Sequence, residues 1–220
     1  TKASILEAQF TSGAGNWCTW MFGRDLVNWN NNFTWAKWVT PSRDLISAFK
    51  QEGDEVRFKE SIVYYDCNWS NYYPSDNYPF MYKCRSANSS IIKYRYADVL
   101  LLKAEALIMQ DTPDLEGAAD IIDEVRDRAK LGALPTSVRS NKNVLLNALL
   151  KERRLELAFE GQRWFDLVRL DKVEEVMNAV YAKDSGRKAQ IYTFDKNSYR
   201  LPIPQSVIDA NDKIHQNPGY

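Results

Sequence analysis

The feature that most limits the fold is a sustained helical repeat of apolar residues that begins at Tyr94. Between residues 94 and 109 apolar side chains recur at intervals of three and four, at Ala97, Leu100, Leu101, Ala104, Leu107 and Ile108. A second apolar row runs beside the first, through Tyr96, Val99, Leu102, Ala106 and Met109. This spacing is typical of an α-helix with an apolar face. Because both rows are apolar, we expect this helix to be buried on two sides.

A second helix is expected between Thr112 and Gly132. Thr112 is a good N-cap, Pro113 suits a first helical position, and Gly132 is a typical stop. The apolar positions between these ends are Leu115, Ala118, Ala119, Ile122, Val125 and Ala129. Together with the preceding helix, the pattern predicts an antiparallel hairpin that resembles a tetratricopeptide-type (TPR-like) helix pair.

Two further helices are expected after the hairpin. The first covers about residues 143–160 and ends at Gly161, with its inward positions at Leu146, Leu149, Leu150, Leu157 and Ala158. The second begins at Arg163 and restarts at Asp171, because Asp171 and Glu174 have capping-box spacing. The tail, residues 192–220, contains prolines at positions 202, 204 and 218, which exclude a continuous helix.

Residues 1–90 have a different composition and carry six of the seven tryptophans. We predict mostly loops there, with one helix between Pro41 and Gly53 and a short strand within residues 57–65. The sequence therefore predicts a mainly α protein with TPR-like helical hairpins. Residues 1–220 are expected to form one region, in which 1–90 is a loop-rich aromatic segment and 91–220 is a helical core with an extended C-terminal tail.

Composition excludes several classes of function. Acidic and basic residues are equal in number, 29 each, so no basic field favours nucleic acid as a partner. The only histidine is His215, in the tail, which argues against His-based metal sites and against Ser-His-Asp or Cys-His catalytic groups. No stretch has the apolar length of a membrane span. We therefore expect no metal, no cofactor and no catalytic residue.

The cysteines, Cys18, Cys67 and Cys84, lack the spacing of a zinc site. Ordinary thiols are the favoured interpretation. The alternative is a Cys67–Cys84 bridge, which would suit an oxidising compartment.

Four segments carry a family resemblance. They are residues 41–45 (PSRDL) with 53–57 (GDEVR), residues 94–106 (YRYADVLLLKAEA), residues 151–169 (KERRLELAFEGQRWFDLVR), and residues 200–204 (RLPIP) leading to 216–220 (QNPGY). In this order and at these distances they resemble the C-terminal portion of a SusD-like protein of the RagB/SusD family.

The resemblance implies a non-catalytic, glycan-binding lipoprotein on the cell-surface side of the outer membrane. Its implied partners are an oligosaccharide or polysaccharide and a TonB-dependent, SusC-like transporter to which the glycan is delivered. Membrane contact would come only from a lipid anchor on an N-terminal part that this chain lacks.

Charged residues in the third segment lie three or four positions apart, at Arg153, Glu156, Glu160, Arg163, Asp166 and Arg169. We interpret them as structural ion pairs. A glycosidase pair of Glu156 and Glu160 is disfavoured, because nearby Arg153 and Arg163 would lower rather than raise a carboxyl pKa.

A sugar site needs exposed aromatic rings with hydrogen-bonding groups nearby. The predicted ligand-binding residues are Trp17, Trp20, Trp29, Asn30, Trp35 and Trp38, in a stretch that also includes Asn16. A second candidate cluster consists of Tyr64, Tyr65, Trp69, Tyr72, Tyr73 and Tyr78. The competing interpretation is that most of these rings pack the loops onto the helices.

Two other functions remain open from the residues alone. A TPR-like scaffold for protein interactions uses the same helices but leaves the tryptophan-rich segment unexplained. A glycan-processing enzyme requires a carboxylate pair in an aromatic cleft, for which Asp25, Asp54 and Asp66 are the loosely suitable candidates.

Overall fold

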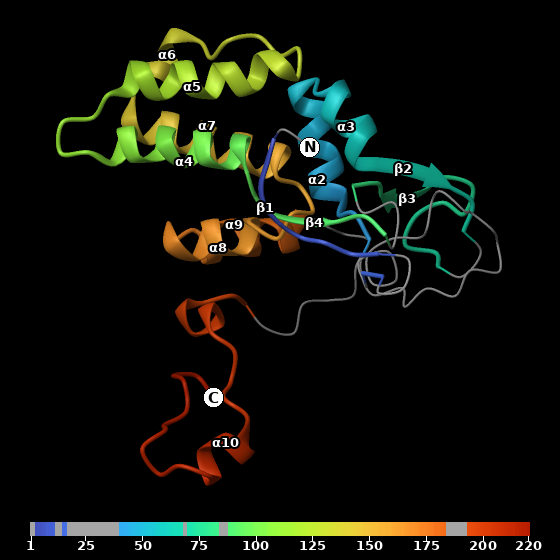
Figure 1. Cartoon of the computed structure of the whole chain (residues 1–220), viewed down its shortest axis with the longest axis vertical. Helices are drawn as coiled ribbons and strands as arrows, with labels where there is room; N and C mark the ends of the chain where they lie inside the picture. Colours follow the sequence, from blue (N-terminus) through green and yellow to red (C-terminus); the bar gives the residue numbers. More distant parts are fainter. Residues whose placement is uncertain (1–2, 12–14, 17–39, 68–69, 84–87, 184–192) are drawn as a thin grey trace. The chain divides into compact units, whose positions relative to one another are not determined.

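The computed structural model describes residues 3–11, 15–16, 40–67, 70–83, 88–183 and 193–220. The chain divides into two compact units, with the boundary between Arg163 and Trp164. The described residues are mainly helical, which confirms the predicted fold class (Figure 1). None of the helices within these ranges combines the length and apolar composition that a membrane crossing requires.

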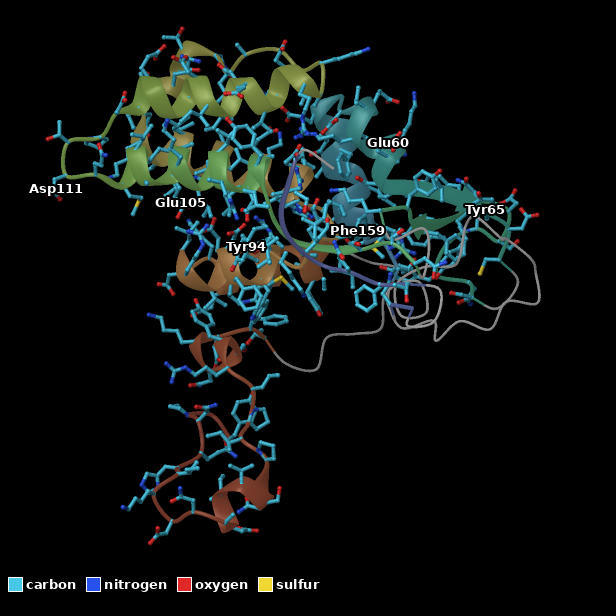
Figure 2. All side chains as sticks on the ribbon, viewed as in Figure 1. Glu60, Tyr65, Tyr94, Glu105, Asp111 and Phe159 are labelled. Atoms are coloured by element: carbon cyan, nitrogen blue, oxygen red, sulfur yellow. The ribbon has the colours of Figure 1, made fainter. Side chains whose placement is uncertain are left out.

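The first unit contains a group of packed helices. Helices α4 (Tyr96–Met109) and α5 (Leu115–Arg128) form the predicted hairpin, α7 (Lys142–Glu156) packs against both, and the short α6 (Thr136–Arg139) packs against α5 and α7 (Figure 1). Side chains fill the space between the ribbons (Figure 2). The buried core consists of Leu101, Ala104, Ile108, Ala118, Ala119, Ile122, Val125, Leu145 and Leu149.

Only one of the two apolar rows of α4 is buried. Leu101 and Ala104 have no exposed surface, and Leu100 is partly buried against the same core. The second row remains exposed along its whole length, at Tyr96, Val99, Leu102, Ala106 and Met109. The prediction that α4 is buried on two sides is therefore wrong. Both α5 and α7 pack against the row that contains Leu101, so the other row has no part in this core.

Several predicted helix ends differ from the structure. Asp114 is the N-cap of α5, in place of Thr112, because its carboxylate accepts a hydrogen bond from the Gly117 amide at 2.9 Å. Helix α5 ends before Gly132, since Lys130 has a left-handed backbone with φ 59°. Helix α7 ends at Glu156 rather than at residue 160, and Phe159 has φ 65°.

The segment before residue 90 is more regular than predicted. Helix α2 (Arg43–Glu52) has Ser42 as N-cap and Gly53 as a left-handed C-cap, which confirms the predicted start and stop. Helix α3 (Glu55–Ser61) occupies the first part of the predicted strand, because Asp54 caps it. Within residues 57–65 the strand is limited to β2 (Ile62–Tyr65), which pairs antiparallel with β3 (Tyr78–Met81).

A second pair of strands was not predicted. Strand β1 (Ser4–Ala8) pairs antiparallel with β4 (Ile91–Arg95), so Tyr94 and Arg95 belong to a strand that leads directly into α4.

The second unit contains α8 from Trp164 onward (Arg163–Arg169), α9 (Val173–Lys183), the 3-10 turn η1 (Lys196–Tyr199) and α10 (Gln205–Asp209). Helix α8 starts where predicted. The proposed capping box at Asp171 does not form, because that residue has φ 54° and α9 begins two residues later.

The tail has no continuous helix, as predicted, and its last residues close it into a loop. The Gln216 side chain both donates to and accepts from the Ile203 backbone, at 2.9 and 2.8 Å. Asn217 donates to the Leu201 carbonyl, and the Tyr220 hydroxyl donates to the Arg200 carbonyl. Side chains within residues 216–220 therefore bind the backbone of the extended segment that precedes α10.

Candidate functional site

The tryptophan site predicted from the sequence lies in residues 17–38. All its residues lie outside the described ranges, namely Trp17, Trp20, Trp29, Asn30, Trp35 and Trp38. The neighbouring Asn16 is described and buried, and its side chain donates to the Ser89 carbonyl at 2.6 Å. Asn16 thus supports the loop structure, and the six residues stay a prediction.

The tyrosines that strand β2 contributes to the second candidate cluster lie on opposite faces of the strand. Successive side chains of a strand point to opposite faces. Tyr65 therefore lies near Phe80, with ring centroids 6.4 Å apart, whereas Tyr64 lies near Phe58 at the same centroid separation. Tyr65 lies at the β2 end of the first unit (Figure 2). Trp69 lies outside the described residues.

Tyr72 and Tyr73 line an open cavity of about 790 Å³ in the loop between β2 and β3. Its lining consists of Cys67, Ser70, Asn71, Tyr72, Tyr73, Pro74 and Ser75. Small-molecule sites have volumes of about 300–1,000 Å³ and combine aromatic walls with a few polar groups. This cavity has both properties, and the two tyrosine rings supply its aromatic wall.

The rings at the cavity are held in a fixed arrangement. Tyr73 meets Tyr72 edge to face at 5.0 Å and meets Tyr78 edge to face at 5.5 Å. The Tyr73 hydroxyl donates to the Pro41 carbonyl at 2.7 Å, and the Tyr78 hydroxyl donates to Ser70 Oγ at 3.3 Å. The cluster is therefore fastened to the start of α2.

Arg43, the first residue of α2, adds a second connection. Its guanidinium carbon lies 3.7 Å from the Tyr72 ring centroid and 4.8 Å from that of Tyr73, and Nη2 donates to the Tyr72 carbonyl. The sequence analysis missed this residue as part of a site. No local signal was available, because 29 positions separate Arg43 from Tyr72.

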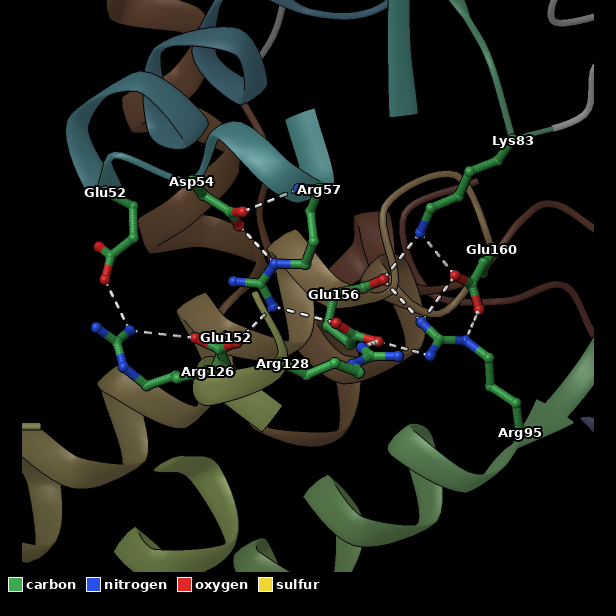
Figure 3. A network of polar contacts seen from close by, with 10 residues as sticks. All are labelled: Glu52, Asp54, Arg57, Lys83, Arg95, Arg126, Arg128, Glu152, Glu156 and Glu160. Atoms are coloured by element: carbon green, nitrogen blue, oxygen red, sulfur yellow. Dashed lines mark hydrogen bonds and ion pairs between the residues drawn. The ribbon is translucent and has the colours of Figure 1, made fainter. Parts of the chain in front are cut away.

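Glu156 and Glu160 of the third segment belong to a different place, a buried network of charged side chains (Figure 3). Glu156 accepts hydrogen bonds from Arg57 at 3.1 Å, from Arg95 at 2.6 Å and from Arg128. Glu160 accepts from Lys83 at 2.7 Å and from Arg95 at 2.6 Å. Each carboxylate thus lies among several cations.

On the other side of Arg57, the network continues through Glu152, which accepts from Arg57 at 2.5 Å and from Arg126 at 3.3 Å. Arg126 in turn donates to Glu52 of α2 at 2.7 Å. The network therefore ties α2, α3, β4, α5 and α7 together.

Within the network, the pKa values of Glu156 and Glu152 shift in opposite directions. Burial alone would raise the pKa of Glu156, but Arg95 and Arg128 outweigh burial and hold this pKa at about 2. Burial raises the pKa of Glu152 despite the attraction of Arg57. Glu156 is therefore ionised at neutral pH, as expected from the sequence.

The cations responsible differ from those expected. Arg153 pairs with Asp98 of α4 at 2.9 Å, and Arg163 donates to the Leu150 carbonyl at 3.1 Å. The dominant partners of Glu156, Arg95 and Arg128, come from other elements. Helical spacing along one segment gives no information about such partners.

The remaining candidates for catalytic or reactive groups are three aspartates and three cysteines, and some of them lie outside the described residues. Asp54 is buried, caps α3 and pairs with Arg57 at 2.5 Å, whereas Asp66 is exposed and Asp25 is not described. Cys67 is a buried free thiol, and the other two cysteines are not described. Among the described side chains, no group of three His, Cys, Asp or Glu residues is arranged to hold a metal ion.

Comparisons with known proteins point to one family. A family model described as the SusD family matches residues 77–220. A SusD-like protein of Formosa agariphila is 43% identical over 99 residues, which cover 42% of this chain and 19% of that protein. A second SusD-like protein of Formosa agariphila is 36% identical over 143 residues, or 62% of this chain and 27% of that protein.

A solved laminarin-binding SusD-like protein matches the fold with a TM-score of 0.67 at 25% sequence identity. The match covers 99% of this chain and 50% of the solved one. The chain thus spans half the length of this structure, and its matches span 19% and 27% of the two curated relatives.

Proposed function

Because the chain belongs to the SusD family, we propose that it is part of a non-catalytic, glycan-binding protein of the outer-membrane surface. In this proposal it captures oligosaccharides or polysaccharides and delivers them to a TonB-dependent, SusC-like transporter. The laminarin-binding relative supports a glycan as the ligand class, because it aligns with 99% of this chain.

The observation that carries the proposal is the aromatic cavity between β2 and β3. Tyr72 and Tyr73 supply flat apolar surfaces, while Ser70, Asn71 and Ser75 add hydroxyl and amide groups to the same lining. Sugars present flat C–H faces surrounded by hydroxyl groups, so this combination suits a pyranose ring.

The ionised state of Glu156 argues against a glycosidase pair of Glu156 and Glu160. A glycosidase needs a carboxyl group whose pKa is raised so that it can protonate the leaving oxygen. The pKa of Glu156 is instead held at about 2, so this residue is a poor proton donor. Its partners, such as Arg95 and Arg57, also occupy its oxygen atoms.

Isothermal titration against a panel of polysaccharides that includes laminarin tests glycan binding, and a reducing-sugar assay on the same mixtures tests catalysis. We expect binding with no new reducing ends. If no glycan in the panel gives a heat of binding, the proposal is refuted. If reducing sugar is released, its non-catalytic part is refuted.

A set of tyrosine variants tests the location of the site. Tyr72→Ala removes the flat platform and should weaken binding about tenfold or more, since burying one large side chain contributes about 1.5–3 kcal/mol. Tyr72→Phe keeps the ring and should retain most of the affinity. Tyr96→Ala, on α4 and 56% exposed, is the matched control and should bind normally.

The tryptophan-rich stretch is proposed as a second source of sugar contacts, and Trp29→Ala in the same titration tests it. Delivery is a separate part of the proposal. We expect the immobilised protein to retain the TonB-dependent transporter from solubilised outer membranes in a pull-down. If it retains no such transporter, delivery is contradicted and glycan binding is not.

A further inference from the structure

A second cavity, of about 290 Å³, lies beside the buried charge network of the first unit. Helix α3 contributes Arg57 and Ser61 to its wall, and Lys83, Arg95 and Arg128 lie around it. It shares no lining residue with the tyrosine cavity within the described part of the chain. One water molecule occupies about 30 Å³, and ligand sites begin at about 300 Å³. The cavity therefore has room for a small molecule.

Two buried polar atoms of α3 have no hydrogen-bond partner among the described residues, namely Nη2 of Arg57 and Oγ of Ser61. Arg57 is 8% exposed and Ser61 has no exposed surface. The Nε and Nη1 atoms of Arg57 donate to carboxylates, whereas no dashed line reaches its third nitrogen in Figure 3. Buried polar groups are nearly always paired, because an unpaired one costs free energy. Both atoms therefore indicate a partner that the polypeptide does not supply.

The positions of these two residues allow one ligand group to meet both. Arg57 and Ser61 are four positions apart on α3, and residues with this spacing lie on the same face of a helix. A guanidinium nitrogen can only donate hydrogen bonds, and a serine hydroxyl has one hydrogen to donate. A ligand group rich in acceptor oxygens therefore matches this face of α3.

The other cations in the wall favour a negatively charged ligand. Lys83 has three N–H groups and donates to the Glu156 carbonyl at 2.8 Å and to Glu160 at 2.7 Å, so one N–H remains. Arg128 donates to Glu156 through Nη2, and its side chain is 59% exposed. The described lining has four cations and three carboxylates. Glu156 and Glu160 are already paired with cations, so they repel an anion less than isolated carboxylates would.

We propose that this cavity binds a small oxyanion, a carboxylate or sulfate group whose oxygens accept hydrogen bonds from Arg57 Nη2 and Ser61 Oγ. Lys83 and Arg128 add positive charge beside it. Arginine suits this role, because its planar fork of N–H groups matches the geometry of oxyanions. Such a group has two sources that an experiment can separate, a free inorganic ion and an acidic sugar. The proposal does not depend on glycan binding at the tyrosine cavity.

Isothermal titration of the full chain at constant ionic strength tests the proposal, with sodium sulfate, glucuronate and glucose as probes. Glucuronate and glucose share a pyranose ring and differ in the carboxylate, so they separate the charge from the sugar. We expect an anion to bind and glucose not to bind. Heat from sulfate alone assigns the site to a free ion, and heat from glucuronate assigns it to an acidic sugar. Binding of neither anion, or equal binding of glucose and glucuronate, would overturn the proposal.

Ser61→Ala tests the contact on α3. It removes the hydroxyl, so affinity for the bound anion should fall about tenfold or more, since hydrogen bonds to charged groups are among the stronger ones. Because this hydroxyl has no partner in the described chain, the substitution should not lower the melting temperature. Ser47→Ala, at an exposed position of α2, is the matched control and should bind the anion normally. Full anion affinity in Ser61→Ala would overturn the proposal.

Arg128→Gln provides a second test at the exposed side of the cavity. It should weaken anion binding about two- to fivefold, the range for a partly exposed ion pair. Arg154→Gln is its control, because Arg154 pairs with Asp44 and does not line the cavity. Equal anion affinities of these two variants would overturn the proposal.

Tyr72→Ala separates the two cavities. It should leave anion binding unchanged, and a loss as large as that in Ser61→Ala would place the anion at the tyrosine cavity and overturn the proposal. Failure of laminarin to bind would refute the proposed function and leave this inference standing, because the two titrations use different probes.

Discussion

Replacing Glu156 by glutamine tests whether the buried network stabilises the fold through an ionised carboxylate. The Glu156 side chain is 2% exposed and accepts from Arg95 at 2.6 Å and from Arg57 at 3.1 Å. Glutamine has nearly the same shape and no charge. The substitution Glu156→Gln therefore removes the ionic part of these contacts with little change in packing.

The expected magnitude follows from the pKa of Glu156. Its usual value is 4.5; burial raises it, Arg95 and Arg128 lower it by more, and the result is about 2. At about 1.4 kcal/mol per pKa unit, ionised Glu156 contributes about 3 kcal/mol to stability. Because the pKa is lowered on folding, this contribution is present above about pH 4.5 and is lost as the pH falls toward 2.

Urea unfolding followed by circular dichroism, on wild type and Glu156→Gln between pH 7 and pH 3, measures this contribution. The difference in unfolding free energy should be about 3 kcal/mol at pH 7 and fall by about half between pH 5 and pH 3, since protonated glutamate resembles glutamine. Glu55→Gln is the control, because Glu55 is exposed and pairs only at the surface with Lys59. Its effect should stay below about 1 kcal/mol. A wild-type advantage over Glu156→Gln that stays constant with pH would refute this reasoning.

Three further outcomes are expected. Leu101→Ala, in the core, should destabilise the protein by about 2–5 kcal/mol, whereas Leu102→Ala on the exposed row of α4 should change the melting temperature little; equal effects would contradict the burial of α4. Glu152→Gln should lower the free energy of unfolding by less than Glu156→Gln does at pH 7, because burial raises the pKa of Glu152. For the same reason, the difference in unfolding free energy between wild type and Glu152→Gln, measured with urea, should become smaller as the pH rises above 4.5. Arg163→Ala should lower the melting temperature through loss of its bond to a carbonyl of α7 and leave glycan affinity in titration unaltered; weaker binding by a fully stable variant would assign Arg163 to a site.

The elements that the sequence predicted well depend on contacts between near neighbours. Ser42 and Gly53 delimit α2 because an N-cap oxygen and a left-handed glycine act on amides and carbonyls only a few residues away. The apolar spacing around Leu101 identified the hairpin and most of its core for the same reason.

The outer row of α4 shows the limit of periodicity. Val99 and Leu102 are as apolar as the residues that are buried, so their spacing could not indicate which side of the helix has neighbours. The β1–β4 pair was missed for a related reason. Its partner residues, such as Ala8 and Ile91, are far apart in the chain, and their pairing depends on packing rather than on local composition.

The sequence by itself determined the helical class and the family. Helix formation and capping involve groups within a few positions of one another, and the motifs are continuous segments. Only the tertiary structure decided which cations surround Glu156 and which side chains gather beside Tyr72. Arg95 lies 61 positions from Glu156, and Arg43 lies 29 positions from Tyr72. Contacts over such separations form when packed elements bring side chains together, and no spacing along the chain encodes them.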